Sequence, residues 1–259
     1  MVDWIRISLL ATVQGIAEFL PISSSGHLVI LGAWMGNLAE SPTLEIILHA
    51  GTLGSILVVY WRRILDLLTR DRRVIGLMVI GTLPAVIVGL AIKTQFPQLL
   101  RSPLLAGAML LVTGGMLIWL GRLEHRGMSY AKLGWAGALL VGCFQAFAIL
   151  PGISRSGSTI LGGRLMGLRS DDAVTFSFLL AIPAILGATV LATKDLLDPE
   201  AAAQPEPWWL LLIGASIAFV VGIAALRWLI HWSRQDRLHW FAWWCVPAGL
   251  LVIGLTLSS

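Results

Sequence analysis

The sequence predicts an all-α integral membrane protein with six transmembrane helices, two re-entrant helical hairpins and an inverted internal repeat. Of the 259 residues, 57% are hydrophobic and 12% are charged, which is roughly half the charged fraction of soluble domains. A lipid bilayer admits only helices or closed barrels. Apolar runs such as GLMVIGTLPAVIVGLAI lack the alternation of barrel strands, so the spans are helices.

Six apolar stretches are long enough to cross the hydrocarbon layer, which needs about 18 or more residues in a helix. In chain order they are 44–61, 74–92, 103–121, 173–193, 208–230 and 240–257. Tryptophans lie at several of the predicted helix ends, where interfacial aromatic belts are expected. These are Trp208, Trp209, Trp240, Trp243 and Trp244.

Four shorter apolar pieces remain, and a proline divides each pair of them. Pro21 separates 4–20 from 22–35, and Pro151 separates 133–150 from 153–168. Proline disfavours helix just before it and suits the first turn of a new helix. We therefore expect two hairpins that enter the membrane, turn inside it and return to the same side, with protein or a cavity around each turn.

The basic residues predict the orientation of the chain. The expected loops 62–73, 122–132 and 231–239 and the segment 164–169 hold most of the 18 lysines and arginines. The positive-inside rule makes these basic segments cytoplasmic. The loop 195–207 is acidic and lies on the other side, together with both chain ends. The net charge of +4 therefore reports topology, and we expect no nucleic-acid partner.

The two proline-containing stretches are also copies of one element. ISSSGH begins at Ile22 and ISRSGS begins at Ile153. One membrane domain, 1–259, then consists of two repeats, about 1–125 and 130–259. Each repeat has one hairpin and three crossings, so the second repeat is inverted. In inverted repeats the broken segments meet near the midplane and form the site.

Five ionisable residues are predicted at membrane depth, where such groups are usually functional. For Glu45, the favourable dipole at a helix start competes well as an explanation. For His49, a core histidine and a site residue are about equally favoured. Glu18, His27 and Arg155 lie at two related turns, and together they predict a site.

The spacing of these residues indicates phosphate chemistry. Gln14 and Glu18 share a helix face, and Ser24 lies one turn before His27, as an activated serine would. Helix starts bind phosphate, and the guanidinium of Arg155 suits phosphate oxygens. A carboxylate near phosphate calls for a hard divalent cation. Taken singly, some hydroxyls are explained as well or better by capping and packing: Ser23, Ser25, Ser156, Ser158 and Thr159.

QGIAEFLPISSSGHL and PGISRSGSTI together resemble the two motifs of the undecaprenyl-diphosphate phosphatase family, also called the bacitracin-resistance family. LEIILHAGTLGSIL, with Glu45, His49 and Gly51, is similar to a weaker third signature. Gln14 stands where many members carry glutamate, so the site has one carboxylate fewer. The first motif comprises Gln14, Glu18, Pro21, Ser23, Ser24, Ser25, Gly26 and His27; the second comprises Pro151, Gly152, Ser154, Arg155, Ser156 and Thr159.

The resemblance implies hydrolysis of undecaprenyl diphosphate to undecaprenyl phosphate and inorganic phosphate, which recycles the lipid carrier of peptidoglycan synthesis. It implies Mg²⁺ or Ca²⁺ as cofactor, a bacterial inner-membrane location and a site open to the periplasmic face. The expected partners are the polyprenyl diphosphate substrate and membrane lipid, with a homodimer left open. The implied catalytic residues are Glu18, Ser24, His27 and Arg155, with Glu18 as metal ligand; the implied substrate-binding residues are Gln14, Ser23, Ser25, Gly26, Ser154, Ser156 and Thr159.

In the mechanism that we infer, Arg155 and helix-start N–H groups bind the diphosphate and stabilise the transition state. Glu18 holds the metal or orients His27, which is the general acid or base. The nucleophile is Ser24 or a water. The rival class is a transporter that flips undecaprenyl phosphate, because inverted repeats and broken helices also build transporters. The pairing of Ser24 with His27 favours the phosphatase.

Overall fold

The computed structural model describes residues 3–35, 42–124, 127–196 and 207–258. Within these ranges the regular elements are helices, apart from an isolated bridge between Met128 and Leu168. The all-α prediction is confirmed.

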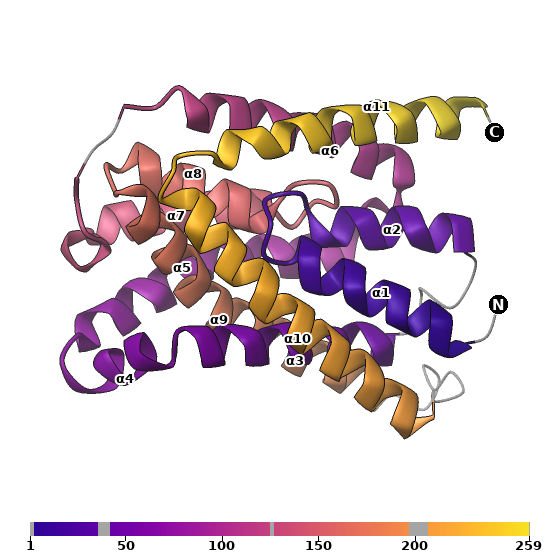
Figure 1. Cartoon of the computed structure of the whole chain (residues 1–259), viewed down its shortest axis with the longest axis horizontal. Helices are drawn as coiled ribbons and strands as arrows, with labels where there is room; N and C mark the ends of the chain where they lie inside the picture. The colour runs from indigo at the N-terminus through magenta and orange to yellow at the C-terminus, as the bar shows by residue number, and fades with distance from the viewer. Residues whose placement is uncertain (1–2, 36–41, 125–126, 197–206, 259) are drawn as a thin grey trace.

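The helices follow one another with short connections (Figure 1). The first half contains α1 (Asp3–Ala17), α2 (Ser24–Met35), α3 (Pro42–Val59), α4 (Trp61–Thr69), α5 (Arg72–Gln95), the 3₁₀ helix η2 (Pro97–Arg101) and α6 (Pro103–Gly121). The second half contains η3 (Tyr130–Lys132), α7 (Trp135–Phe147), α8 (Arg155–Leu165), α9 (Ser170–Leu196), α10 (Trp208–Ser233), η5 (Leu238–Phe241) and α11 (Ala242–Ser258).

The predicted spans coincide with α3, α5, α6, α9, α10 and α11. Helices α5, α6, α9 and α10 are long and apolar enough to cross a membrane by themselves. Helix α11 qualifies together with η5, as Leu238–Ser258, and α3 qualifies together with α4. The chain bends by 71° between α3 and α4. The expectation of a loop over 62–73 was therefore wrong for its first part. There Leu67 is buried while Arg62 and Arg63 are exposed, so an amphipathic helix forms at the apolar boundary.

The chain breaks predicted at Pro21 and Pro151 separate α1 from α2 and α7 from α8. The two turns lie against each other in the interior, because the backbone N–H of Gly152 donates to Ser23 Oγ at 3.2 Å. How these helix pairs sit in the membrane, and the inverted repeat, remain predictions. The contact between the turns is the feature that assembles the site.

Helix α8 is the centre of the molecule and packs against α6, α7 and α9. It is rich in small residues and is buried from Ser156 to Arg164. Around it, α10 crosses α1 and α3, α11 lies along α6, and α5 lies along α7. Glycine permits the closest of these approaches, since a Cβ at Gly142 on α7 would collide with the Gly81 carbonyl on α5. Small residues at such crossings are typical of membrane helices.

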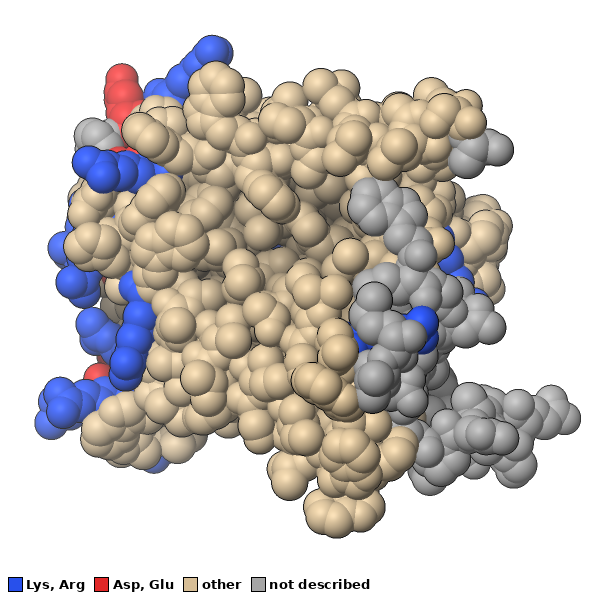
Figure 2. Space-filling view, turned by 45° about the vertical axis from the view of Figure 1, so that its right-hand side comes forward, with Lys and Arg blue, Asp and Glu red and all other residues tan. Residues whose placement is uncertain are grey.

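The basic segments that were predicted to share one side lie together at one end of the molecule. Arg73 donates to the carbonyls of Ala131 and Leu133 at 2.9 and 2.7 Å. At the same end, Arg164 donates to the Glu124 carbonyl at 3.3 Å. Figure 2 shows Lys and Arg along this edge and an uncharged band beside it. The acidic loop 195–207 lies almost wholly outside the described residues, as do Arg126 and the chain ends.

Candidate active site

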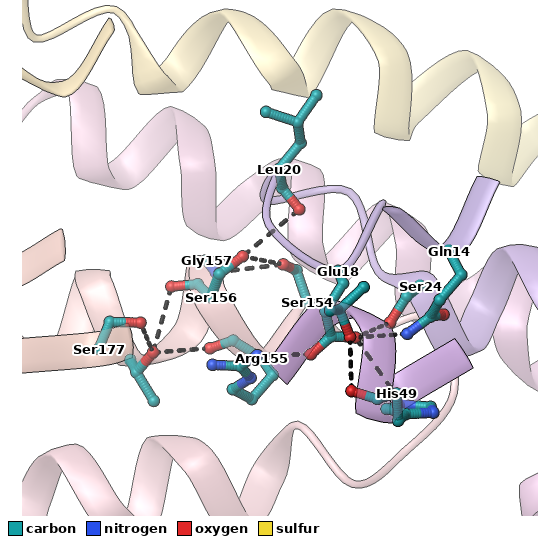
Figure 3. A network of polar contacts seen from close by, with 12 residues as sticks. Gln14, Glu18, Leu20, Ser24, His49, Ser154, Arg155, Ser156, Gly157 and Ser177 are labelled. Carbon is teal, nitrogen blue, oxygen red and sulfur yellow. Dashed lines mark hydrogen bonds and ion pairs between the residues drawn. The ribbon is translucent and has the colours of Figure 1, made fainter. Parts of the chain in front are cut away.

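Glu18, at the end of α1, is the centre of a polar network that joins both turns (Figure 3). Arg155 Nη2 lies 2.5 Å from Glu18 Oε1, and Ser24 Oγ donates to Glu18 Oε2 at 2.7 Å. Gln14, one helical turn earlier, donates to the same Oε2 from Nε2 at 3.1 Å. Glu18 is 8% exposed and Gln14 is fully buried, so three donors stabilise a carboxylate that has little access to solvent.

Both Ser24 and Arg155 are the first residues of their helices, α2 and α8. Because the turns lie against each other, these two helix starts face the same carboxylate. Backbone N–H groups in a first helical turn have no partners within the helix, and the dipole makes this end positive. The structure therefore places two anion-binding helix ends beside Glu18.

The two helix starts are capped by equivalent serines. Ser23 Oγ accepts from the N–H of Gly26 at 3.2 Å, and Ser154 Oγ accepts from the N–H of Gly157 at 3.1 Å. Ser23 has a φ of 70°, which is uncommon outside glycine. Its hydroxyl also accepts the N–H of Gly152 at 3.2 Å. Ser23 therefore caps one turn and binds the other.

Gly152 and Thr113 hold the second turn in place. Gly152 has a φ of 94°, and a Cβ there would collide with the Ala106 carbonyl on α6. Thr113, also on α6, donates to the Gly152 carbonyl at 2.7 Å and accepts from the Ser154 N–H at 3.0 Å. Thr113 lies outside both sequence motifs, and a threonine within an apolar helix does not by itself indicate such a role.

His27 does not contact Ser24 in the way that their spacing predicts. Its Nδ1 lies 2.7 Å from the Ser23 carbonyl, and its Nε2 accepts from the indole N–H of Trp244 at 2.9 Å. A tryptophan N–H only donates, so the ring proton is on Nδ1. Both nitrogens are thereby occupied, and the hydroxyl of Ser24 binds Glu18 instead.

The imidazole nearest to Glu18 belongs to His49 on α3, for which the sequence left two explanations open. Its Nε2 lies 3.9 Å from Glu18 Oε2, and its Nδ1 lies 2.9 Å from the Glu45 carbonyl. The side chain is 27% exposed. The structure therefore puts His49 at the polar network and not in the apolar core. Glu45 is exposed in the first turn of α3, as the helix-dipole explanation predicts.

The remaining candidate hydroxyls bind mainly within the protein. Ser156 Oγ lies 3.2 Å from Ser154 Oγ, and Thr159 donates to the Arg155 carbonyl at 2.8 Å. Ser156 and Thr159 are buried, whereas Ser25 is exposed. Their roles as substrate ligands stay predictions. The contacts show how they stabilise the turn and the first turn of α8.

Two buried atoms at the network have no hydrogen-bond partner among the described residues, Arg155 Nη1 and Gln14 Oε1. An unpaired polar group in the interior is costly, so such atoms mark a place for a polar ligand. The guanidinium offers donors to an anion, and the amide oxygen offers a lone pair to a cation or a donor. This arrangement can bind an anionic group beside a serine hydroxyl.

Whether the site can hold a divalent cation depends on the oxygen atoms that it offers. The described residues contain no group of three His, Cys, Asp or Glu arranged to hold a metal. The carboxylate of Glu18 and the free oxygen of Gln14 are one turn apart and are hard ligands. They fit a cation such as Mg²⁺, which takes one or two protein oxygens and fills the rest with water and ligand phosphate.

Comparisons with known proteins match nearly the whole chain. A family model described as "Bacitracin resistance protein BacA" matches residues 7–251. A protein of Rhodopirellula baltica named undecaprenyl-diphosphatase is 73% identical over 257 residues, covering 99% of this chain and 100% of the relative. A relative of the same name from Desulfatibacillum aliphaticivorans is 39% identical and covers 96% of this chain and 98% of the relative. Another relative of that name, from Alkaliphilus metalliredigens, is 40% identical and covers 95% of this chain and 96% of the relative.

We expect Ser23→Ala to lower the free energy of unfolding by about 1–3 kcal/mol, because the N–H groups of Gly26 and Gly152 lose their acceptor. Thermal unfolding in detergent, followed by tryptophan fluorescence, measures the effect. Ser25→Ala is the matched control, since Ser25 is exposed and its hydroxyl has only a 3.4 Å contact with Ser23. Equal unfolding midpoints for the two variants would show that Ser23 does not hold the turns together.

Proposed function

The chain belongs to the bacitracin resistance protein BacA family, and we propose that it hydrolyses undecaprenyl diphosphate to undecaprenyl phosphate and inorganic phosphate. The observation that carries this proposal is the position of Arg155. Its guanidinium stands at a helix start inside a membrane protein, beside Glu18 and Ser24, and its Nη1 has no partner in the part of the chain that the structure describes. A diphosphate supplies the anion that these groups lack, while its prenyl tail stays in lipid.

The proposed location is the bacterial inner membrane, with the site open to the periplasmic face. The gathering of the basic segments at one end supports the proposed orientation of the chain in the membrane, because that end is expected to be cytoplasmic. The product is the lipid carrier used in peptidoglycan synthesis, so the enzyme recycles that carrier. The family description associates such proteins with bacitracin resistance.

Binding of the diphosphate is assigned to Arg155 and to the first N–H groups of α2 and α8. The guanidinium fork can contact two phosphate oxygens, and the two helix ends add positive potential. These donors also face the negative charge that spreads over the transferred phosphoryl group in the transition state. They are held by the capped turns before the substrate arrives, which is the condition for electrostatic catalysis.

The nucleophile is assigned to Ser24. Its Oγ forms a bond to the terminal phosphorus as the bond from phosphorus to the bridging oxygen breaks, and undecaprenyl phosphate leaves. Water then attacks the phosphoserine and releases inorganic phosphate, which restores the hydroxyl. The contact of Ser24 Oγ with Glu18 at 2.7 Å supports this choice, because the hydroxyl proton already points to a carboxylate.

Proton transfer is assigned to the pair of Glu18 and His49. The imidazole Nε2 of His49 lies 3.9 Å from the carboxylate oxygen that accepts the Ser24 proton. His27, the acid or base expected from the sequence, has both nitrogens engaged by Ser23 and Trp244. We propose that His27 acts by orienting the turn that carries Ser24.

A divalent cation, Mg²⁺ or Ca²⁺, is proposed as cofactor. Glu18 and the free oxygen of Gln14 would hold it together with the diphosphate of the substrate. When bound, it supplies charge neutralisation to the phosphate oxygens. Because Arg155 already pairs with Glu18, the protein alone offers the cation little net charge, and most of the binding comes from the substrate.

Arg155→Ala is expected to reduce phosphate release from undecaprenyl diphosphate by at least about 10³-fold, by analogy with other arginines that stabilise phosphoryl transfer. The assay uses purified protein in detergent, with and without EDTA. Arg101→Ala is the control, because Arg101 is an exposed arginine in η2. If folded wild-type protein with metal released no phosphate, lipid flipping would become the better assignment.

Ser24→Ala should abolish a phosphoserine that rapid acid quenching traps on the wild-type protein. Mass spectrometry of the quenched protein locates the modification by peptide. Ser25→Ala is the control, since this neighbouring serine is exposed and its hydroxyl lies near Ser23 Oγ, at 3.4 Å. A Ser24→Ala variant with most of the wild-type rate would make water the nucleophile.

His49→Ala is expected to slow phosphate release by about 10²-fold or more, the usual contribution of a general acid–base group. Its thermal unfolding midpoint should stay near that of the wild type. His27→Ala should lower both the rate and the midpoint, because it breaks the contacts to Ser23 and Trp244. His231→Ala, on the exposed last turn of α10, is the control, and wild-type rates for His49→Ala would refute the assignment.

A further inference from the structure

An aromatic hollow lies on the surface close to the candidate active site. We call it the aromatic groove, and its volume is about 440 Å³. The end of α10, the 3₁₀ helix η5 and the first turn of α11 build it. Its lining residues are Trp232, Trp240, Phe241, Trp243 and Trp244.

The groove has a packed floor and an open rim. Phe241 is 8% exposed, and its ring centroid lies 5.2 Å from that of Trp232. Trp240 packs against Trp232 at 6.4 Å. On the rim, Trp243 is 82% exposed. The floor is therefore fixed by ring contacts, while the rim offers flat apolar faces to a ligand.

Trp244 connects the groove to the site. Its indole N–H donates to His27 Nε2 at 2.9 Å, and the two rings are stacked with an angle of 14° between their planes. His27 in turn contacts the Ser23 carbonyl, directly before Ser24. Trp244 thus lines the groove and is hydrogen-bonded to His27, on the first turn of the helix that presents Ser24.

The sequence assigned Trp240, Trp243 and Trp244 to an interfacial belt, and their arrangement goes beyond that. A belt needs rings only at the depth of the lipid headgroups. Here the three tryptophans line one hollow with Trp232 and Phe241, and Trp244 is hydrogen-bonded to His27. Trp208 and Trp209, at the start of α10, are exposed and do not line this hollow, so they serve as belt residues for comparison.

We propose that the aromatic groove binds the prenyl chain of the substrate, in the isoprene units that follow the diphosphate. This inference rests on the proposed function, which places the diphosphate at Arg155. The tail would then extend from the site toward the end of the molecule that carries the basic segments, where η5 lies. Aromatic faces make close dispersion contacts with the flat alkenes and methyl groups of such a chain. Indole rings lose little conformational entropy on binding, which favours such contacts.

The test compares Trp240→Ala, Trp243→Ala and their double variant with Trp208→Ala and Trp209→Ala. The double variant lacks a large apolar surface that would contact the tail. Its KM for undecaprenyl diphosphate should therefore rise roughly tenfold, with little change in kcat. Inhibition by inorganic phosphate, a probe of the head-group site, should keep its wild-type strength. The belt variants should keep the wild-type KM.

A photoreactive prenyl phosphate, with the reactive group on its first isoprene units, provides a readout that does not need turnover. Labelled peptides should contain residues 240–244, and undecaprenyl phosphate should compete with the label. Trp243→Ala is the most informative variant if the double variant unfolds, because Trp243 is largely exposed and its loss should leave the packed floor in place.

The outcomes separate the groove from the proposed function. If folded groove variants hydrolyse the substrate at the wild-type rate with an unchanged KM, or if the label is found elsewhere, the proposal for the groove is overturned and the proposed function stands. An equal rise of KM in the Trp208 and Trp209 variants also overturns it, since any interfacial tryptophan would then suffice. Absence of phosphate release from folded wild-type protein overturns the proposed function, whereas labelling of 240–244 in that case would keep the groove as a prenyl-phosphate site.

Discussion

The ion pair between Glu18 and Arg155 is the interaction on which the rest of the structure depends. A single charge inside a membrane protein is costly, and removing one partner of a buried pair leaves the other uncompensated. Each partner stands at a break in the apolar chain, so the pair forms only when the two turns meet. The contacts of Ser23 and Thr113 with Gly152 hold that meeting point, and the burial of α8 at the centre follows from it.

Much of this arrangement could be predicted from the sequence, because it depends on composition along the chain. Apolar length predicted the spans, and the prolines at 21 and 151 predicted where the helices break. Polar residues at membrane depth predicted that Glu18 and Arg155 share a site, since neither is stable alone. Each of these inferences uses only local hydrophobicity, helix propensity and the cost of a buried charge.

The choice of partners could not be predicted in the same way, since it depends on contacts between distant segments. Spacing on a helix placed His27 near Ser24, but Trp244 in the last helix and the Ser23 carbonyl occupy its nitrogens. His49 was undecided until the packing of α3 placed it beside Glu18. Thr113 gave no signal because a threonine is ordinary in an apolar helix, and only its contacts with the second turn show its role.

The resting contact of Arg155 with Glu18 has a consequence for turnover. A guanidinium that is already bound to a carboxylate must exchange part of that contact for phosphate oxygens when substrate arrives. Glu18 therefore competes with the substrate for Arg155. This competition weakens the binding of any anion that needs the same guanidinium. In the proposed mechanism, once water has hydrolysed the phosphoserine, renewed pairing of Glu18 with Arg155 would favour the release of inorganic phosphate. The same ion pair that orders the empty site would thus also oppose retention of the phosphate product.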